Sequence, residues 1–378
     1  MKVAILTQPL HTNYGGTLQA FALQYVIKSL GHEPETINYR KQLPNTSLIR
    51  KILSRIKQKI ISGRIIYSFD HDEMKIISKY HDEFINKYIK YSDVVYDVGT
   101  LKSKVISGGF HSIVVGSDQT WRPRYSPRID SFFLDFLQGD ESIKKISYAS
   151  SFGTDVWEFD QIQTNKFKLL LKQFHFVSVR EKSAVKLCMD KFDVQAEHVL
   201  DPTLLLEKDI YMNLLSAKPT EHKKNGIFNY VLDKSLEKKD IIKKCAKILQ
   251  MPVFSSYPLS THKESCTIED FNDYIYPPIE EWISSFYYAD YVITDSFHGT
   301  VFSIIFNKPF ISVANEYRGK ARFISLLELF GLEDRLVSNS NDINSTLLFS
   351  PINFEEVNLR LVELRKNSIH LLQMSLLN

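Results

Sequence analysis

The chain has 378 residues, 44% of them hydrophobic and 24% charged, which is enough apolar sequence for two globular domains and excludes a disordered or fibrous protein. Its formal net charge of +3 gives no reason to expect nucleic acid as a partner, and no run of about 18 apolar residues is present to span a bilayer. Three cysteines, far apart and in no metal-ligand or redox spacing, indicate reduced thiols in a cytoplasmic protein: Cys188, Cys245 and Cys266.

The first elements predict a βαβ unit. The apolar run at residues 2–7, "KVAILT", is expected to be a buried strand rather than a signal peptide, because it is short and has no small-residue cleavage site after it. A Gly-Gly turn at 15–16 leads into an apolar helical pattern that Gly31 ends, and a second strand is expected from Glu35.

Similar units repeat along the rest of the chain. Further strands are expected at 112–118, 144–153, 176–180, 197–206, 225–232, 252–258, 290–297 and 309–315. Strands that alternate with helical patterns predict an α/β protein with parallel sheets. Because a mixed helical and polar stretch between Pro202 and Pro219 precedes the charged "KPTEHKKNG", we assign 1–210 to a first domain, 211–350 to a second and 351–378 to a helical tail.

Residues 41–69 depart from this pattern. No acidic residue occurs between Glu35 and Asp70, and apolar positions such as Ile49, Ile52 and Ile56 recur at helical spacing among lysines and arginines. The segment therefore predicts a basic amphipathic helix. Such a helix either covers a domain edge with its charges in water, or contacts an anionic partner such as a membrane surface or a phosphorylated, lipid-linked acceptor.

The motif "DSFHGT" at 295–300 follows a predicted strand directly, at the end where open parallel sheets bind ligands. A helix that starts in this motif exposes unpaired backbone amides to an anion, and Gly299 would let that ligand approach the backbone. The hydroxyls of Ser296 and Thr300 add hydrogen bonds, and His298 can exchange a proton near neutral pH. In the alternative, structural interpretation Ser296 is a plain N-cap and His298 a turn residue.

Three more strand ends carry polar residues. Arg180 can bind a carboxylate or phosphate in bidentate fashion, or it pairs with an acidic neighbour on the surface. Asp118 ends another strand, and Trp121 beyond it can stack on a sugar; the alternative is a structured loop with solvated arginines. Asn13 and Tyr14 belong to the βα turn of the first unit, where a Gly-Gly pair alone is a weak signal.

Several ligand signatures are absent from the sequence. It contains neither G-x-G-x-x-G nor G-x-x-x-x-G-K-[ST], and neither H-E-x-x-H nor a paired-cysteine zinc spacing. The D-x-D of Asp70 and Asp72 lies in a charged segment away from any strand end and is interpreted as solvated surface. Neither a metal nor a resident cofactor is expected.

In their order along residues 1 to 340, the motifs together resemble those of the polysaccharide pyruvyl transferase family. The matching segments are "NYGGTLQAFAL", "GSDQTWRP", "ISYASSFG", "VSVREKSAV", "LDPTLLL", "EEWISSFYYADYVITDSFHGTVFSIIFNKPFI" and "RGKARFISLLELFGLEDRL". The "DSFHGT" block is the most specific part, whereas the basic segment and the tail after 350 match nothing in the family.

The resemblance implies two Rossmann-like domains whose parallel sheets face each other across a cleft, similar to the GT-B glycosyltransferases. It also implies transfer of pyruvate from the co-substrate phosphoenolpyruvate to two hydroxyls of one sugar, which forms a cyclic ketal on a surface polysaccharide or its lipid-linked precursor. By the match to "SFHGT", His298 would be the acid or base. By the match to "VSVRE", Arg180 would bind the anionic donor.

The other expected site residues follow from their places at the strand ends. We assign donor contacts to Ser296, Gly299 and Thr300, a second catalytic role to Asp118, and acceptor contacts to Asn13, Tyr14 and Trp121. The expected enzyme is cytoplasmic, with peripheral contact to the anionic inner face of the membrane through the basic segment.

Two other functions stay open at this point. A GT-B-like glycosyltransferase would use the helix at His298 to hold the diphosphate of a nucleotide sugar, although no glutamate-based ribose motif follows "PFISVAN". A catalytically silent carbohydrate-binding protein or scaffold would be expected to have lost His298 and Arg180, and both are present.

Overall fold

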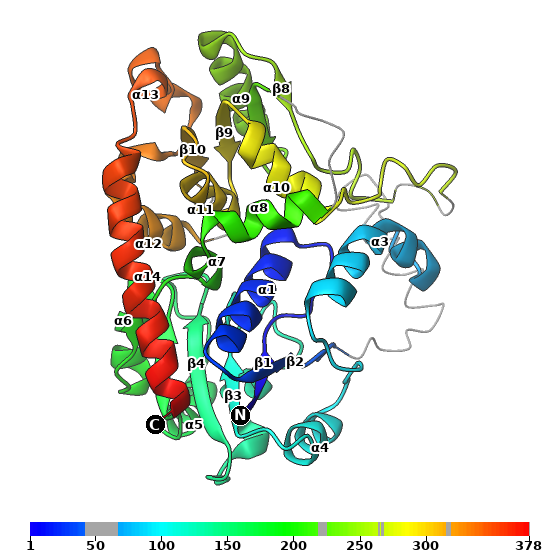
Figure 1. The fold of residues 1–378 in the computed structure, drawn as a ribbon, viewed down its shortest axis with the longest axis vertical. Helices are drawn as coiled ribbons and strands as arrows, with labels where there is room; N and C mark the ends of the chain where they lie inside the picture. The colour runs from blue at the N-terminus through cyan, green and yellow to red at the C-terminus, as the bar shows by residue number, and fades with distance from the viewer. Residues whose placement is uncertain (42–66, 218–224, 264, 266–267, 315–318, 378) are drawn as a thin grey trace.

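The computed structural model describes residues 1–41, 67–217, 225–263, 265, 268–314 and 319–377. Two parallel sheets with packed helices lie one above the other along the long axis of the molecule (Figure 1). The predicted α/β architecture with two parallel sheets is therefore confirmed. Residues 42–66 of the predicted basic helix, and Cys266, lie outside the described residues, while Cys188 and Cys245 are buried free thiols.

The first sheet has the strand order β2-β1-β3-β4-β5-β6, with every neighbouring pair parallel. Its strands are β1 (Lys2–Leu6), β2 (Glu33–Thr36), β3 (Ser112–Val115), β4 (Lys144–Ser150), β5 (Phe176–Val179) and β6 (Glu197–His198). Residues of β3 are buried at every position, as expected for a sheet covered on both faces. Strands β2 and β3 lie on opposite sides of β1, so the strand order of the sheet reverses between β1 and β3. Open parallel sheets bind their ligands at such a switch point.

Most helices of the first domain begin at a residue whose side chain caps them. They are α1 (Tyr14–Ser29), α3 (His71–Tyr88), α4 (Val98–Ser107), α5 (Gln161–Leu171), α6 (Lys182–Leu187), α7 (Pro202–Leu205) and α8 (Lys208–Ala217). Asp70, the first residue of the D-x-D, caps α3 and forms a reciprocal capping box with Glu73. The carboxyl group of Asp70 therefore has a structural use at a helix start.

The second sheet has the order β11-β10-β9-β7-β8, again entirely parallel. Its elements are β7 (Ile227–Tyr230), α9 (Leu236–Leu249), β8 (Val253–Phe254), α10 (Ile279–Tyr288), β9 (Tyr291–Thr294), α11 (Phe297–Ile305), β10 (Phe310–Val313), α12 (Lys320–Phe330), β11 (Leu336–Val337) and α13 (Ser345–Phe349). Strands β8 and β9 lie on opposite sides of β7, so this sheet has its switch point between β7 and β9.

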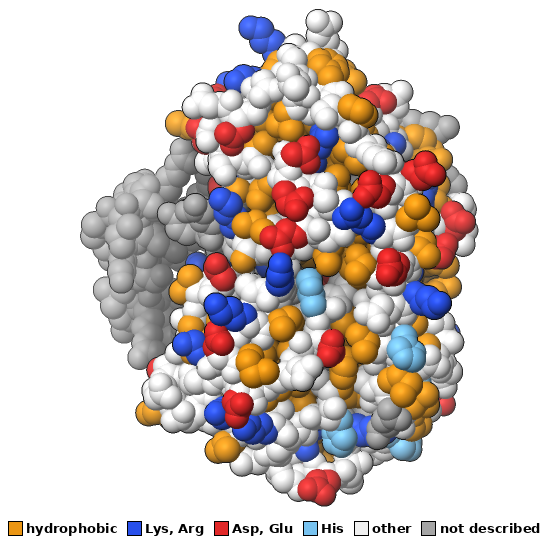
Figure 2. Space-filling model, turned by 90° about the vertical axis from the view of Figure 1, so that its left-hand side faces the viewer, with side chains coloured by type: hydrophobic (Ala, Val, Ile, Leu, Met, Phe, Trp, Pro, Cys, Tyr) orange, Lys and Arg blue, Asp and Glu red, His pale blue; other side chains and the backbone are white. Residues whose placement is uncertain are grey.

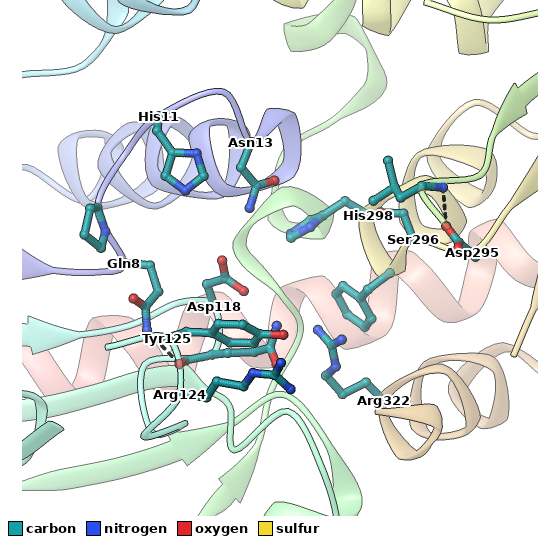
Figure 3. Close-up of a pocket in the computed structure, with 14 residues that line it drawn as sticks. Gln8, His11, Asn13, Asp118, Arg124, Tyr125, Asp295, Ser296, His298 and Arg322 are labelled. Carbon is teal, nitrogen blue, oxygen red and sulfur yellow. Dashed lines mark hydrogen bonds between the residues drawn. The ribbon is translucent and has the colours of Figure 1, made fainter. Parts of the chain in front are cut away.

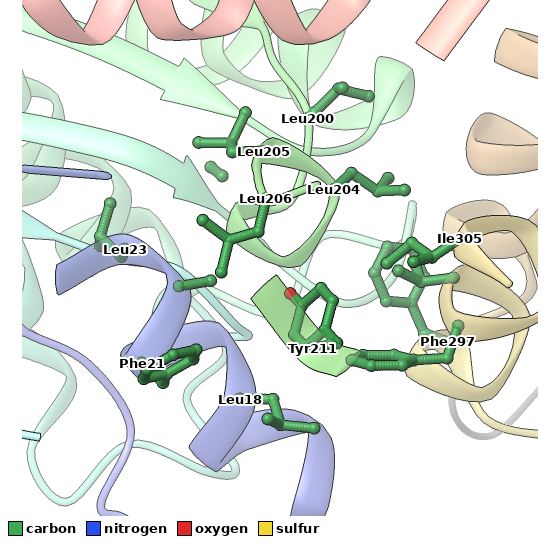
Figure 4. Packing of buried hydrophobic residues seen from close by; sticks show 14 of the residues in the cluster. Leu18, Phe21, Leu23, Leu200, Leu204, Leu205, Leu206, Tyr211, Phe297 and Ile305 are labelled. Carbon is green, nitrogen blue, oxygen red and sulfur yellow. The ribbon is translucent and has the colours of Figure 1, made fainter. Parts of the chain in front are cut away.

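One continuous apolar cluster joins the two domains. Leu18 of α1, Leu204 of α7 and Ile305 of α11 all belong to it and are buried, as the close view in Figure 4 shows. At its edge Tyr14 stacks on Trp282 of α10, with ring centroids 5.4 Å apart. The facing ends of the two sheets are therefore held by a packed core rather than by a flexible linker alone.

The last helix, α14 (Phe354–Leu377), follows the second sheet in sequence but packs along the first domain (Figure 1). The Ser368 hydroxyl accepts a hydrogen bond from the Leu200 amide, and Arg365 donates to the carbonyls of Leu204 and Leu206. This helix therefore adds a second tie between the domains.

Acidic and basic side chains are interspersed over the face of the molecule shown in Figure 2. Nucleic-acid binding requires a large basic patch. Among the described residues on that face, Figure 2 shows no large patch of a single sign. In the described part of the chain no helix is both long and apolar enough to cross a membrane.

Candidate active site

A cavity of about 620 Å³ lies where the switch points of the two sheets face each other. Its first wall comes from the loops after β1 and β3, and its second wall from residues after β7 and β9 and from α12 (Figure 3). The first wall includes Gln8, His11, Asn13, Asp118, Arg124 and Tyr125, and the second includes Leu232, Asp295, Ser296, Phe297, His298 and Arg322. Four of the candidates predicted from the sequence line this one cavity: Asn13, Asp118, Ser296 and His298.

His298 is the second residue of α11 and its side chain enters the cavity from the helix N-terminus (Figure 3). Ser296 caps this helix by accepting a hydrogen bond from the Gly299 amide. Within the described residues His298 Nε2 makes no hydrogen bond, and the nearest carboxylate oxygen, Oδ2 of Asp201, is 3.7 Å away. The imidazole is thus held near a negative charge, and its Nε2 atom is buried with almost no exposed surface.

Gly15 supports the other side of this imidazole. A Cβ atom at residue 15 would overlap the Nδ1 and Cγ atoms of His298. The Gly-Gly turn of the first domain therefore has a physical reason in the second domain, because only glycine lets α1 approach the histidine so closely.

We expect Gly15→Ala to lower kcat by about 10²-fold by displacing the His298 ring, since errors of about 1 Å at a reacting group have effects of this size. Alanine is favoured over glycine in a helix by about 1 kcal/mol, so the melting temperature should change little. Steady-state kinetics and thermal denaturation check both expectations. Gly99→Ala is the matched control, because Gly99 is likewise the second residue of a helix and its added Cβ meets only the Asp97 side chain; equal losses in both variants would contradict this role of Gly15.

Asp118 follows β3 in a left-handed backbone conformation, with a φ of 75°. Its carbonyl oxygen accepts hydrogen bonds from the amides of Thr120 and Ser151, which fixes the turn. Its Oδ1 atom accepts a hydrogen bond from Nη2 of Arg180 at 3.0 Å. The Asp118 carboxylate therefore reaches the cavity already paired with a buried cation.

Arg180 lies behind the cavity, with its side chain fully buried. Nη1 donates to Oδ2 of Asp201 at 2.7 Å, so the guanidinium joins two carboxylates. Asp201 also accepts hydrogen bonds from Ser117 and Thr203. The predicted direct grip of Arg180 on the donor is corrected, because both of its terminal nitrogens already bind protein carboxylates and the residue does not line the cavity.

This buried cluster lowers the pKa of both carboxyl groups. Burial alone would raise the pKa of Asp118, but the positive charges of Arg180, His298 and Arg322 outweigh it and leave the pKa below the usual range. In the same way His298 and Arg180 overcome burial and lower the pKa of Asp201. Both groups are therefore carboxylates at neutral pH.

Arg322, near the start of α12, is a cavity residue that the sequence interpretation missed. Burial and the positive charge of Arg180 lower the pKa of Arg322 to about 10, so it is a cation at neutral pH. Both guanidiniums lie near the Phe297 ring, with their central carbons 4.7 Å (Arg180) and 5.7 Å (Arg322) from the ring centroid. The only sequence signal was its place in the segment "RGKARF", which belongs to the matching motifs.

Two predicted donor contacts are corrected by the position of α11 against β9 and β10. A Cβ at Gly299 would overlap the Thr294 side chain, so this glycine serves close helix–strand packing rather than the approach of a ligand. The Thr300 hydroxyl is fully buried and lies 2.7 Å from the hydroxyl of Ser312. Ser296 is the one hydroxyl of the motif that lines the cavity.

Two predicted acceptor contacts are corrected as well. Trp121 is fully buried, stacks on Phe133 and donates its indole N–H to the Phe132 carbonyl, so it cannot stack on a sugar in this structure. Tyr14 is also fully buried, and its hydroxyl donates to the Pro277 carbonyl. Both aromatics belong to cores, which is where most large aromatics lie.

His11 is a further cavity residue that was not predicted. The His11 side chain is accessible from the cavity, but the surrounding protein limits its hydration. This desolvation and the positive charge of Arg40 lower the pKa of His11, and the negative charge of Asp118 only partly opposes them. The imidazole of His11 is thus mainly neutral at pH 7. Among the described residues no group of three or more histidine, cysteine or carboxylate side chains is arranged to hold a metal ion.

Two facing parallel sheets with a cavity at their carboxyl ends define a GT-B-like fold. Solved structures share this fold over nearly the whole chain. UDP-GlcNAc 2-epimerase from Neisseria meningitidis, bound to UDP-GlcNAc, has a TM-score of 0.55 at 9% identity and covers 100% of both chains. The UDP-N-acetylglucosamine 2-epimerase from Rickettsia bellii has a TM-score of 0.51 at 10% identity, covering 98% of this chain and 96% of the other. At such identities the likeness concerns the fold alone.

The family follows from the sequence itself. A sequence model described as polysaccharide pyruvyl transferase matches residues 13–317, which include residues of both cavity walls but not Gln8, His11 or Arg322. The chain belongs to the polysaccharide pyruvyl transferase family, as the motifs predicted. A comparison with curated proteins found no match.

Proposed function

We propose that this protein is a pyruvyl transferase that uses phosphoenolpyruvate to form a pyruvate ketal on a sugar of a surface polysaccharide or its precursor. The observation that supports the proposal most directly is the placement of His298 at the start of α11, in the same cavity wall as Arg322. Family membership supports the same reaction class.

The donor side of the cavity suits a small polyanion. Arg322 is a buried cation, and the first amides of α11 point their N–H groups toward the helix start, where an anion is stabilised. The acidic lining residues are already neutralised: Asp118 by Arg180, and Asp295 by Lys238 and the amides of Leu232 and Asp233. We therefore assign the phosphate and carboxylate of the donor to Arg322, Ser296 and the start of α11.

The reaction needs one proton donor and a base for two hydroxyls. A proton adds to the methylene carbon of phosphoenolpyruvate, and the positive charge that forms at the neighbouring carbon is attacked by the first sugar hydroxyl, which loses its proton. The bond to phosphate then breaks, with the electron pair leaving on oxygen, and the second hydroxyl attacks the same carbon and loses its proton. One of the released protons replaces the one consumed, and the other balances the charge on the departing phosphate.

His298 is the residue we assign to the first proton transfer, because its imidazole lines the cavity at the start of α11 and imidazoles are common acid–base groups. Asp118 then orients a sugar hydroxyl from the opposite wall, and neutral His11 offers a second basic group there. The pKa of Asp118 is lowered, so we assign it mainly the role of a hydrogen-bond acceptor rather than a strong base.

A ligand screen by thermal shift and calorimetry tests the donor. Phosphoenolpyruvate at about 100 times its Kd should add about 2.7 kcal/mol to the free energy of unfolding, and Arg322→Gln should weaken this stabilisation. A panel of nucleotide sugars is measured beside it. Stabilisation by a nucleotide sugar alone would contradict the proposal and favour a GT-B-like glycosyltransferase, in which the start of α11 holds a diphosphate.

A further inference from the structure

The loop after β3 presents a tyrosine to the cavity at the place where the sequence had suggested a tryptophan. Tyr125 lines the cavity and is 44% exposed, which is unusual among the large aromatics of the site. Trp121, four residues earlier, is fully buried. The loop thus uses one aromatic as an anchor in the core and leaves the other accessible.

The Tyr125 ring is supported from behind by a fixed guanidinium. The Arg122 guanidinium carbon lies 5.1 Å from the ring centroid. Arg122 is buried and is held by hydrogen bonds to Gln119 at 3.0 Å and Glu158 at 3.2 Å. A Cβ at Gly153 would overlap the Gln119 side chain, so glycine is needed there to keep this support in place.

The backbone of the loop is equally well fixed. The Tyr125 amide donates to the Arg122 carbonyl, and the Ser126 hydroxyl donates to the Thr120 carbonyl. Gln8, from the loop after β1, donates to both Ser126 and the Gln119 carbonyl. One face of the Tyr125 ring is therefore covered by a cation inside a rigid turn, and the accessible part of the ring is held ready for a ligand without further ordering.

Arg124 stands beside this ring on the same wall of the cavity (Figure 3). It is exposed and makes no hydrogen bond or ion pair with the described residues, in contrast to the arginines at 122 and 128 of the same loop. It lies on the first-domain wall, whereas Arg322 and the start of α11 are on the second-domain wall. Each wall of the cavity therefore carries one lining arginine, Arg124 on the first wall and Arg322 on the second.

We propose that Tyr125 is the stacking platform for the acceptor sugar and that Arg124 binds a phosphate carried by that sugar, so that the acceptor is a glycosyl phosphate rather than a neutral glycan. An aromatic ring gives an apolar sugar face a large, rigid contact, and a guanidinium recognises phosphate in bidentate fashion. The proposal rests on the proposed transferase function for the identity of the acceptor. It deepens that function by stating which chemical class of acceptor the first wall recognises.

The first test measures saccharide binding without turnover. Saturation-transfer NMR and calorimetry are run with galactose 1-phosphate and mannose 1-phosphate against their uncharged methyl glycosides. We expect Tyr125→Ala to weaken binding of the phosphorylated sugars about tenfold and Tyr125→Phe to retain it, because the ring is kept. Tyr96→Ala is the matched control, since Tyr96 is 51% exposed but lies outside the cavity.

Arg124→Gln should remove the preference for the phosphorylated sugar over its methyl glycoside and leave the melting temperature unchanged. With turnover, both variants should raise the acceptor KM while the phosphoenolpyruvate KM and kcat stay near those of the wild type. Binding of UDP-galactose is then compared with binding of galactose linked to a short-chain polyprenyl diphosphate. Tighter binding of the first would indicate a nucleotide as the carrier of the phosphate, and tighter binding of the second would indicate a lipid.

The outcomes separate this proposal from the proposed function. If phosphoenolpyruvate does not bind while the saccharides bind in a Tyr125-dependent way, the donor assignment is wrong but the role of Tyr125 in acceptor binding is supported. If no sugar binds the wild type, or if Tyr125→Ala binds every sugar as the wild type does, the platform is overturned. If methyl glycosides bind as tightly as the phosphates, the role of Arg124 is overturned.

Discussion

His298→Ala should abolish turnover, with kcat lower by at least about 10²-fold, while the protein stays folded. Loss of a positioned acid or base typically costs about 10² to 10⁴ in rate. The stability cost should be smaller than that of removing Arg180, because Asp201 loses the nearby His298, 3.7 Å away, but keeps its hydrogen bond to Arg180. Phosphate release from phosphoenolpyruvate and the melting temperature are the two measurements.

The control for this experiment is His111→Ala, because His111 is an exposed histidine that lies outside the cavity, directly before β3. Its kcat should equal that of the wild type. His298→Gln adds a second arm, since glutamine keeps most of the volume but cannot carry the proton. Phosphate release at the wild-type rate in either His298 variant would contradict the assigned role.

Much of this site could be predicted from the sequence because its residues follow strand ends. The rule that parallel sheets bind ligands at their carboxyl ends depends only on strand order, and strands can be recognised from short apolar runs. Asn13, Asp118 and His298 each stand directly after such a run or at the start of the next helix, and all three line the cavity. The positions of local turns and caps were therefore sufficient to find them.

The residues that were misplaced depend on contacts between distant segments. Trp121 and Tyr125 lie in the same loop, and only the packing of Trp121 on Phe133 decides which of them is buried. Arg322 begins a helix of the second domain and reaches the site because α12 packs beside α6, where the Lys182 amide donates to the Ser325 hydroxyl. No local pattern contains this information.

Arg180 shows the same limit in its clearest form. Its place after β5 predicted an arginine near the cavity, but its partners Asp118 and Asp201 follow β3 and β6. The two carboxylates take both terminal nitrogens of the guanidinium, so the cation that the sequence assigned to the donor neutralises the protein instead. The order of the strands in the sheet therefore decides which carboxylates pair with this buried arginine.

Arg180→Met should lower the free energy of unfolding by about 3–5 kcal/mol at pH 7, because it leaves two buried carboxylates without their shared cation. Arg128→Met is the control: Arg128 pairs with Asp135 but is 38% exposed, and such pairs contribute about 1 kcal/mol or less. Melting temperatures of both variants against the wild type at pH 7 provide the comparison. A loss at Arg180 no larger than the loss at Arg128 would contradict the buried cluster.

The pH dependence gives the sharper test, because its sign is fixed by the two carboxyl groups. In the wild type the folded pKa values of Asp118 and Asp201 are lowered, so their stabilising contribution is present above the unfolded value near 3.9 and is lost only as the pH falls through the lower folded values. Removal of Arg180 takes away one of the positive charges that lower these pKa values, so both pKa values should rise, although His298 still acts on both groups. The folded variant then takes up protons at a higher pH than the wild type does, and part of the destabilisation disappears on acidification. The stability difference between wild type and Arg180→Met should therefore be largest at pH 7–8 and shrink below about pH 4. A difference that stays constant from pH 8 to pH 4 would mean that the cost comes from lost packing rather than from the unpaired carboxylates.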